Sequence, residues 1–352
     1  MSECTEKDYA CLLVNFGGPR NLEEIESFLR ELLSDQDVIR TNLPQLIHRI
    51  IFSRVAKKRA LKIREDYEQI GGKSPIFEDT EAIASMLQKN LHIEVIPFHR
   101  YLPSTHSDFF SKVRSLSQKE LRILPLFPQF SYATTGSIAR FFSENFCGKT
   151  LQKMLWVKSY PSQVAYINSM KKVLQDFLLE KGLPEEETIL LFSAHGIPQK
   201  FVCTGDIYQK ECKLSFEKIR KFFPKAQHLL SYQSKFGKGL WLTPSTEDTC
   251  KTLVPDMEKR KNVVLVPLSF TSDHIETLFE IEKLYLPLLQ ERNLSAFRCP
   301  ALNREIHWID AMGKILNDPS LFTTTQMLIR HKEYKVGCRN CCKNSCLCVV
   351  SE

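Results

Sequence analysis

Residues 263–280 read VVLVPLSFTSDHIETLFE, and this stretch decides the fold. Its first part, residues 263–270, is an apolar run of the length expected for a buried parallel strand. Its second part, residues 272–280, places one histidine and three acids directly after that strand. Ligands of open α/β sheets bind beyond the carboxyl ends of the strands, so this composition indicates metal or proton chemistry there.

A helix is expected to follow, with Ser272 or Asp273 as its N-cap. Glu276 and Glu280 are four residues apart and would project from one face of that helix. Their oxygens suit a divalent cation, so we predict Glu276 as a metal-handling carboxylate and Glu280 as a secondary one.

A second histidine follows another strand-like run. Residues 188–192 read TILLF, and residues 193–198 (SAHGIP) break the strand. Gly196 and Pro198 favour a tight turn that would direct the ring of His195 into the same crevice. A lone histidine is more often a satisfied structural residue, but two such turns in one sheet favour a shared site.

Short β-rich runs alternate with amphipathic helical stretches, which is the pattern of parallel sheets covered on both faces. We predict two α/β domains, 9–158 and 159–305, because a turn and a helix-start signal coincide at residues 159–162. A helical extension over 306–337 and a cysteine-rich tail over 338–352 would follow. The predicted strands are residues 11–16, 93–98, 121–126, 155–158, 188–193, 228–233 and 263–270.

Composition bounds the class of protein. The 352 residues, 43% hydrophobic and 25% charged, suffice for two domains with full cores. The start, MSECTEKD, lacks the apolar region of a secretory signal, and no run approaches the roughly 18 apolar residues of a spanning helix. We expect a cytoplasmic protein with peripheral contact at the inner face of the membrane, whose twelve cysteines are thiols or metal ligands.

The net charge of +7 is spread along the chain, so it favours anionic carboxylates or lipid headgroups as partners and no nucleic acid. The turn Gly17-Gly18-Pro19 follows the first strand and raises the alternative of a nucleotide site. Neither GxGxxG nor GxxxxGK[ST] occurs in the chain, so we do not expect phosphate binding there.

Residues 43–59 carry an apolar stripe at spacings of three and four, with basic residues between and after it. The stripe predicts either an ordinary amphipathic helix packed on its own core or a lip over a ligand slot that also touches a membrane. The apolar members are Leu43, Leu46, Ile47, Ile50, Ile51 and Val55.

Six motifs, in order along nearly the whole chain, resemble those of the ferrochelatase family. The resemblance reaches about residue 309 and implies insertion of ferrous iron into a porphyrin. It also implies two similar doubly wound, Rossmann-like α/β domains, each a parallel sheet flanked by helices, with the active-site cleft between them. The motifs are LLVNFGGP (12–19), IGGKSP (70–75), FPQFSYATTGS (127–137), FSAHGIP (192–198), YQSKFGKGLWLTPST (232–246) and SFTSDHIETLFEIE (269–282).

The resemblance implies roles for single residues. Phe16 would lie against the macrocycle edge, and residues 43–62 would form the lip of the porphyrin slot. Residues that would contact the porphyrin or line its pocket are Arg59, Lys62, Arg100 and Tyr101.

The expected mechanism begins with a porphyrin distorted out of plane between the domains, which exposes the pyrrole nitrogen lone pairs. Two protons must leave as iron enters, so His195 would accept a proton or hold iron through its neutral imidazole. Glu276 would be its acidic partner, and Glu280 would extend the path. The face of iron entry stays open, and Arg100 and Tyr101 could act on the other face.

The predicted enzyme is a lyase that makes protoheme from protoporphyrin IX, the terminal step of heme biosynthesis. Coproporphyrin III, with four carboxylates instead of two, is the alternative substrate. A related chelatase that inserts cobalt or nickel is another alternative. Nitrogen and oxygen ligands discriminate weakly between these metals, so only the motifs favour iron. A non-catalytic tetrapyrrole or metal carrier would need fixed axial ligands and no ladder of carboxylates. A monomer and a homodimer are both compatible with the sequence.

The tail holds five cysteines within residues 338–348, with no apolar period that would place them in a core. Cys338, Cys341 and Cys346 have the C-x2-C-x4-C spacing of ferrochelatases that carry a [2Fe-2S] cluster. Such members can supply a fourth cysteine where this chain has Tyr132. A substitute would come from Cys147, Cys342 or Cys348, and the alternative is a tail without metal.

Overall fold

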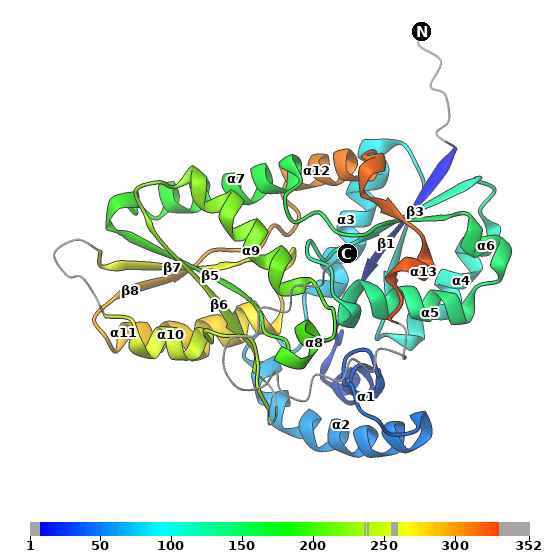
Figure 1. The fold of residues 1–352 in the computed structure, drawn as a ribbon, viewed down its shortest axis with the longest axis horizontal. Coiled ribbons are helices and arrows are strands. Elements are labelled where there is room, and N and C mark those ends of the chain that lie inside the picture. The colour runs from blue at the N-terminus through cyan, green and yellow to red at the C-terminus, as the bar shows by residue number, and fades with distance from the viewer. Residues whose placement is uncertain (1–7, 236, 238, 255–259, 331–352) are drawn as a thin grey trace, which may run out of the picture.

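The computed structural model describes residues 8–235, 237, 239–254 and 260–330, and within them the chain forms two β-sheets side by side (Figure 1). The first sheet has the order β2-β1-β3-β4-β9, and the second has the order β6-β5-β7-β8. The strands of the first sheet are Tyr9–Asn15 (β1), Val95–His99 (β2), Glu120–Pro125 (β3), Met154–Val157 (β4) and Phe322–Thr323 (β9). Those of the second are Thr188–His195 (β5), Gln227–Gln233 (β6), Asn262–Pro267 (β7) and Ser295–Arg298 (β8).

Helices connect the strands and cover the sheets. Before β5 they are Ile25–Ser34 (α1), Gln45–Glu68 (α2), Ile76–Leu91 (α3), His106–Ser115 (α4), Ser137–Asn145 (α5), Gly148–Gln152 (α6) and Val164–Glu180 (α7). After it they are Gln199–Cys203 (α8), Tyr208–Ile219 (α9), Thr246–Thr252 (α10), Leu286–Gln290 (α11), Ile306–Leu316 (α12) and Thr325–Leu328 (α13). Two segments, Tyr132–Gly136 and Glu276–Tyr285, are π-helical.

The apolar runs of the sequence become the central strands. Every residue of β1 and β7 is buried, as expected for parallel strands with helices on both faces. Within the second sheet β5 pairs in parallel with β6 and with β7, with His195 opposite Gln233 and Ser193 opposite Pro267. The carboxyl ends of these three strands therefore meet at one edge.

Helices α3, α7 and α12 join the two sheets. Helix α12 packs against both α3 and α7, and buried side chains of all three belong to one hydrophobic cluster. Figure 1 shows α7 and α12 along one side of the molecule, with α1 and α2 on the other. The shared core fixes the second sheet relative to the first.

The predicted α/β class and parallel sheets are confirmed, and each predicted strand occurs within three residues of its expected bounds. Strands β8 and β9 were not predicted. Strand β8 (SAFR) has no buried residue, and β9 has two residues and pairs antiparallel with β4 at the sheet edge. Neither carries the continuous apolar run that marks a buried strand. Through β9, the chain after α12 returns to the first sheet.

Candidate active site

His195 is the last residue of β5 and lies at the carboxyl edge of the second sheet. Its backbone N–H donates to Ser269 Oγ at 2.9 Å, and its carbonyl accepts from the hydroxyl of Tyr208 at 2.9 Å. The following Gly196 is required by packing, because a Cβ there would lie 2.6 Å from the carbonyl oxygen of Gln233. These contacts fix the backbone that carries the imidazole.

Glu276 brings the two histidine turns together. Its Oε2 lies 2.9 Å from His195 Nδ1 and 3.5 Å from Nε2 of His274. The side chains of His195 and Glu276 keep 36% and 28% of their surface exposed, so a ligand can reach the pair. The structure thus brings together the two turns that the sequence suggested would share a site. The contact from His274 was not predicted, although the sequence places it two residues from Glu276.

The helix that carries the carboxylates is a π-helix over Glu276–Tyr285, where an α-helix was expected. The wider turn of a π-helix is uncommon and occurs often at functional sites. The predicted caps are wrong: no side chain caps this helix. Asp273 instead accepts from Arg298 Nη1 at 2.8 Å and Asn303 Nδ2 at 2.9 Å, so its carboxylate holds the preceding turn.

Glu280 lies one turn beyond Glu276 in a cradle of donors. Its Oε2 accepts from Ser234 Oγ at 2.5 Å and from the hydroxyl of Tyr285 at 3.3 Å. Gln233 Nε2 donates to the carbonyl of Glu276 at 2.7 Å and lies 3.4 Å from the Glu280 carboxylate. Gln233 is the last residue of β6 and Ser234 follows it. The predicted strand over residues 228–233 ends at the same point, so the sequence held a signal for these two residues.

Charge and burial separate the pKa values of these groups. Burial alone would lower the pKa of His195, but the neighbouring Glu276 carboxylate outweighs it and raises that pKa. Burial alone would raise the pKa of Glu276, but His195 and His274 hold it far below its usual range. Burial and the Glu276 charge raise the pKa of Glu280 to about 7. The site therefore combines an ionised carboxylate, a strengthened imidazole base and a carboxyl that titrates near neutrality.

The predicted lip is helix α2, and its apolar stripe faces outward. Only four of its 24 residues are buried. The structure contradicts the alternative of an ordinary amphipathic helix packed on its own core, because most of the stripe is exposed. Its exposed members are Leu43, Leu46, Ile47, Ile50 and Ile51, and Leu61 further along is also exposed.

The C-terminal half of α2 lies against the site. Burial lowers the pKa of Arg59, and the carboxylates of Glu276 and Glu280 oppose that shift, which places its guanidinium within electrostatic reach of both. Ile275, beside Glu276, packs into the cluster that includes residues of α1 and α2. Lys62 is exposed, three residues beyond Arg59 on the same helix.

The remaining predicted pocket residues gather after β1 and β2. The ring of Phe16 lies 5.2 Å from the ring of Tyr101 and is half-buried. Arg100 Nη2 donates to Asp35 at 3.0 Å, and the buried Tyr101 hydroxyl donates to the same carboxylate at 3.1 Å. Both residues therefore have a common internal acceptor, which sequence reasoning missed.

The cysteines predicted as cluster ligands, Cys338, Cys341 and Cys346, lie outside the described residues, as do Cys342 and Cys348. Cys147 is exposed at the start of α6. Across the described ranges, no group of three or more His, Cys, Asp or Glu side chains is arranged to hold a metal ion. Among the same residues, no helix is both long and apolar enough to span a bilayer.

The fold and site define an α/β protein with an imidazole–carboxylate centre at the carboxyl edge of its second sheet. A family model described as Ferrochelatase matches residues 8–319. A ferrochelatase of Chlamydia abortus is 44% identical over 305 residues, covering 87% of this chain and 94% of the relative. One from Chlamydia muridarum is 42% identical over 321 residues, covering 91% and 98%. The chain belongs to the ferrochelatase family.

A solved structure, SirB from Bacillus subtilis with Fe3+, has the same fold with a TM-score of 0.51 at 12% sequence identity. It covers 88% of this chain and 93% of its own. Membership of the ferrochelatase family makes this protein a lyase of heme biosynthesis that inserts iron into a porphyrin.

Proposed function

We propose that the protein inserts ferrous iron into protoporphyrin IX, with His195 and Glu276 as its catalytic residues. The observation that carries this proposal is the 2.9 Å contact between His195 Nδ1 and Glu276 Oε2 at an accessible strand end. A base held by an ionised carboxylate suits proton removal from a pyrrole nitrogen. A carrier would gain nothing from the adjoining carboxyl group of Glu280.

Two protons leave the porphyrin for each Fe2+ that enters. The Glu276 carboxylate strengthens the His195 imidazole as a base, so this ring accepts the two protons one after the other and passes each on before it takes the next. Glu280 has a pKa of about 7 and can take up and release protons near neutral pH, which makes it the next group on the path. Glu276 and Glu280 also offer oxygen ligands to the incoming iron.

The lip favours protoporphyrin IX over coproporphyrin III. The exposed side chains of α2 include Leu46, Ile47 and Ile50, which form an apolar surface on the N-terminal half of the helix whose C-terminal half approaches the site. An apolar surface contacts vinyl and methyl groups at no desolvation cost, whereas two further carboxylates would need polar partners. Arg59 and Lys62 supply positive charge for the two propionates of protoporphyrin IX.

The substrate is tested by offering the purified protein each porphyrin with ferrous iron under anaerobic conditions. Metalloporphyrin absorbance then reports kcat/KM for each. We expect a higher value for protoporphyrin IX. A higher value for coproporphyrin III would make that porphyrin the substrate and would leave the proposed reaction unchanged. Porphyrin that binds without turnover would instead favour a carrier.

We also propose a [2Fe-2S] cluster ligated by Cys338, Cys341 and Cys346, with a fourth ligand among Cys147, Cys342 and Cys348. The described chain ends beside the π-helical segment that begins at Tyr132, since the carbonyl of Leu328 lies against Gly136. That is where family members can supply a cysteine. Cys147 is exposed and lies beyond the other end of α5, between α5 and α6.

The cluster is tested on anaerobically purified protein by measuring iron, acid-labile sulfide and visible absorption. We expect equal amounts of iron and sulfide and a reddish-brown colour that serine at Cys338 bleaches. Colourless protein without sulfide that inserts iron at full rate would contradict the cluster.

We also propose that the protein contacts a membrane surface, which the exposed apolar stripe of α2 supports. The proposed protein is cytoplasmic and is a monomer or a homodimer.

A further inference from the structure

We propose that Arg40 and Asp206 are positioning residues for iron insertion, which clamp the loop before the lip helix onto the second half of the molecule. This inference rests on the proposed function. The loop over residues 35–44 joins α1 to α2, and α2 carries Arg59 against the catalytic carboxylates. A clamp on this loop therefore sets where the lip lies relative to His195.

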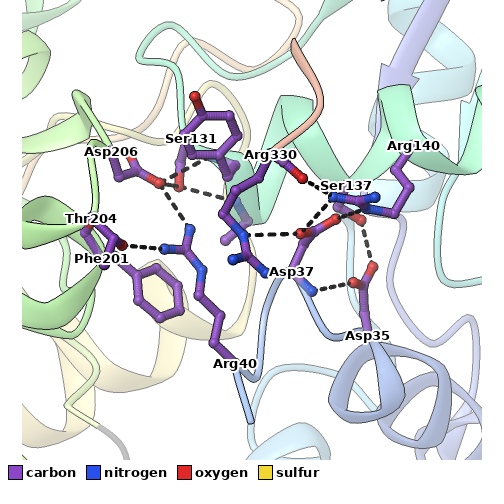
Figure 2. A network of polar contacts seen from close by, with 12 residues as sticks. Asp35, Asp37, Arg40, Ser131, Ser137, Arg140, Phe201, Thr204, Asp206 and Arg330 are labelled. Atoms are coloured by element: carbon purple, nitrogen blue, oxygen red, sulfur yellow. Dashed lines mark hydrogen bonds and ion pairs between the residues drawn. The ribbon is translucent and has the colours of Figure 1, made fainter. Parts of the chain in front are cut away.

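Arg40 is held on three sides by residues around α8 (Figure 2). Its Nη2 lies 3.3 Å from Asp206 Oδ2, and its Nη1 donates to Thr204 Oγ1 at 3.1 Å. The guanidinium carbon lies 3.5 Å from the centroid of the Phe201 ring. The side chains of Arg40 and Asp206 are only 8% and 0% exposed, so this is an interior contact and not a surface ion pair.

Asp206 joins both halves of the molecule through one carboxylate. The oxygen that faces Arg40 also accepts from Ser131 Oγ at 2.8 Å and from the backbone N–H of Tyr132 at 3.0 Å. Its other oxygen accepts from the backbone N–H of Tyr208 at 3.1 Å. The carboxylate thus holds the first residue of α9 in place while it binds Arg40 from the lip loop.

Tyr208 continues this chain of contacts to the catalytic base. Its hydroxyl donates to the carbonyl of His195 at 2.9 Å. Two links therefore separate Arg40 from the backbone of His195: the Asp206 carboxylate and the Tyr208 side chain. A shift of the carboxylate would move Tyr208 and, through it, the strand end that carries the imidazole.

The start of the same loop is attached to the porphyrin-side residues. Asp35 accepts from Arg100 at 3.0 Å and from Ser137 Oγ at 2.5 Å. Asp37 pairs with Arg140 and lies 3.5 Å from Arg330 (Figure 2). The loop is thus anchored to the first sheet at its start and to the Asp206 carboxylate at Arg40.

The burial of Arg40 means that its charge needs the nearby Asp206 carboxylate. Burial lowers the pKa of Arg40 to about 10, and the Asp206 charge opposes that shift. Removing one partner of a buried pair leaves the other without full compensation. Asp206 keeps three other donors when Arg40 is replaced, so an apolar variant at position 40 retains a satisfied carboxylate.

The test compares Arg40→Met and Tyr208→Phe with the matched control Arg30→Met. Arg30 is an exposed arginine on α1 whose contact with Glu31 is 3.7 Å. For each full-length variant, kcat and KM for protoporphyrin IX are measured anaerobically, together with Tm and the absorption spectrum of bound porphyrin. The double variant Arg40→Met/Tyr208→Phe completes a double-mutant cycle.

We expect kcat per folded molecule to fall by about 10²-fold in Arg40→Met, the size expected for a misplacement of about 1 Å, with an altered bound-porphyrin spectrum. The kcat of Tyr208→Phe should fall by a smaller factor. The kcat of the double variant should fall by less than the product of the two single factors, because both substitutions act through His195. Arg30→Met should match wild type.

Wild-type kcat and spectrum in Arg40→Met, with only Tm lowered, would overturn the inference. Multiplicative losses in the double variant would do the same. If Arg40→Met fails to fold, a wild-type kcat in Tyr208→Phe would still overturn it, because this substitution removes only the hydroxyl. Wild-type protein without insertion activity would instead refute the proposed function, so the two failures are distinguishable.

Discussion

The π-helix Glu276–Tyr285 and helix α2, the proposed lip, both approach the candidate site and differ in how they are held. The carboxylate of Glu280 accepts from Ser234 and Tyr285, and Glu276 contacts two histidines. Helix α2 buries only four of its 24 residues and exposes its apolar stripe. The proposed catalytic carboxylates are thus held by several polar contacts, whereas the proposed porphyrin-binding surface of α2 is left exposed.

The largest effect is expected from His195→Ala, which removes the proposed base. Loss of a general base acts on the chemical step, so kcat should fall by about 10² to 10⁴-fold. Porphyrin binding should stay within about tenfold, since the lip is unchanged. Anaerobic insertion kinetics and porphyrin titration check both numbers. Turnover near the wild-type rate would remove His195 from the mechanism.

Glu276→Gln keeps the shape of the side chain and removes its charge. Without the carboxylate, the pKa of His195 loses its main upward influence and the base weakens. We expect kcat to fall by about 10²-fold and the dependence on iron concentration to change, because an oxygen ligand is also lost. An unchanged rate and metal dependence would assign Glu276 a purely structural role.

Glu280→Gln should flatten the pH profile of kcat and hold it at the level that wild type has at low pH. Burial and the Glu276 charge raise the pKa of Glu280 from 4.5 to about 7, so it is protonated at pH 6 and ionised at pH 8. Only the ionised form accepts a proton, so wild-type kcat should rise as pH increases through about 7. The glutamine variant should lose this rise. If kcat still rises with pH in Glu280→Gln, another titrating group is responsible for the rise.

The raised pKa of Glu280 also predicts a small effect on folding. A carboxyl whose folded pKa exceeds its unfolded value binds more protons when folded, so the ionisation of Glu280 opposes folding as pH rises from about 4.5 to 7. Replacement by glutamine should remove that dependence. Urea unfolding of both proteins at pH 5 and pH 8 measures it.

The lip should give the smallest effects on the fold. Leu46 and Ile50 are 72% and 48% exposed, so Leu46→Ser/Ile50→Ser should change the free energy of unfolding by about 0.5 kcal/mol or less. The KM for protoporphyrin IX should rise several-fold with kcat unchanged. The control is Leu179→Ser, an exposed leucine of α7. An unchanged KM would show that the stripe does not contact the substrate.

The sequence predicted the parts that depend on local pattern. The apolar runs of β5 and β7 indicated neighbouring parallel strands, and His195 and Glu276 meet because the carboxyl ends of such strands share one edge. The π-helix was not predicted, because two glutamates four residues apart fit an α-helix equally well. The short strand β8 lacks an apolar run and gave no signal.

The rest depends on contacts between distant residues. Arg40 and Asp206 are 166 residues apart, and neither belongs to a periodic pattern. Arg59 approaches Glu276 because the C-terminal half of α2 packs near the segment that carries Ile275 and Glu276. The family resemblance marked Arg100 and Tyr101 but gave no sign that Asp35 binds both. Contacts of this kind are set by packing of the whole chain rather than by local sequence.

The most direct test of the account measures kcat and the Kd for protoporphyrin IX in His195→Ala and in Leu46→Ser/Ile50→Ser, side by side under anaerobic conditions. We expect opposite results: the first variant loses kcat and keeps Kd within about tenfold, and the second keeps kcat and binds porphyrin more weakly. A His195→Ala variant with weak binding and normal kcat would contradict the division between a fixed chemical centre and an exposed capturing surface.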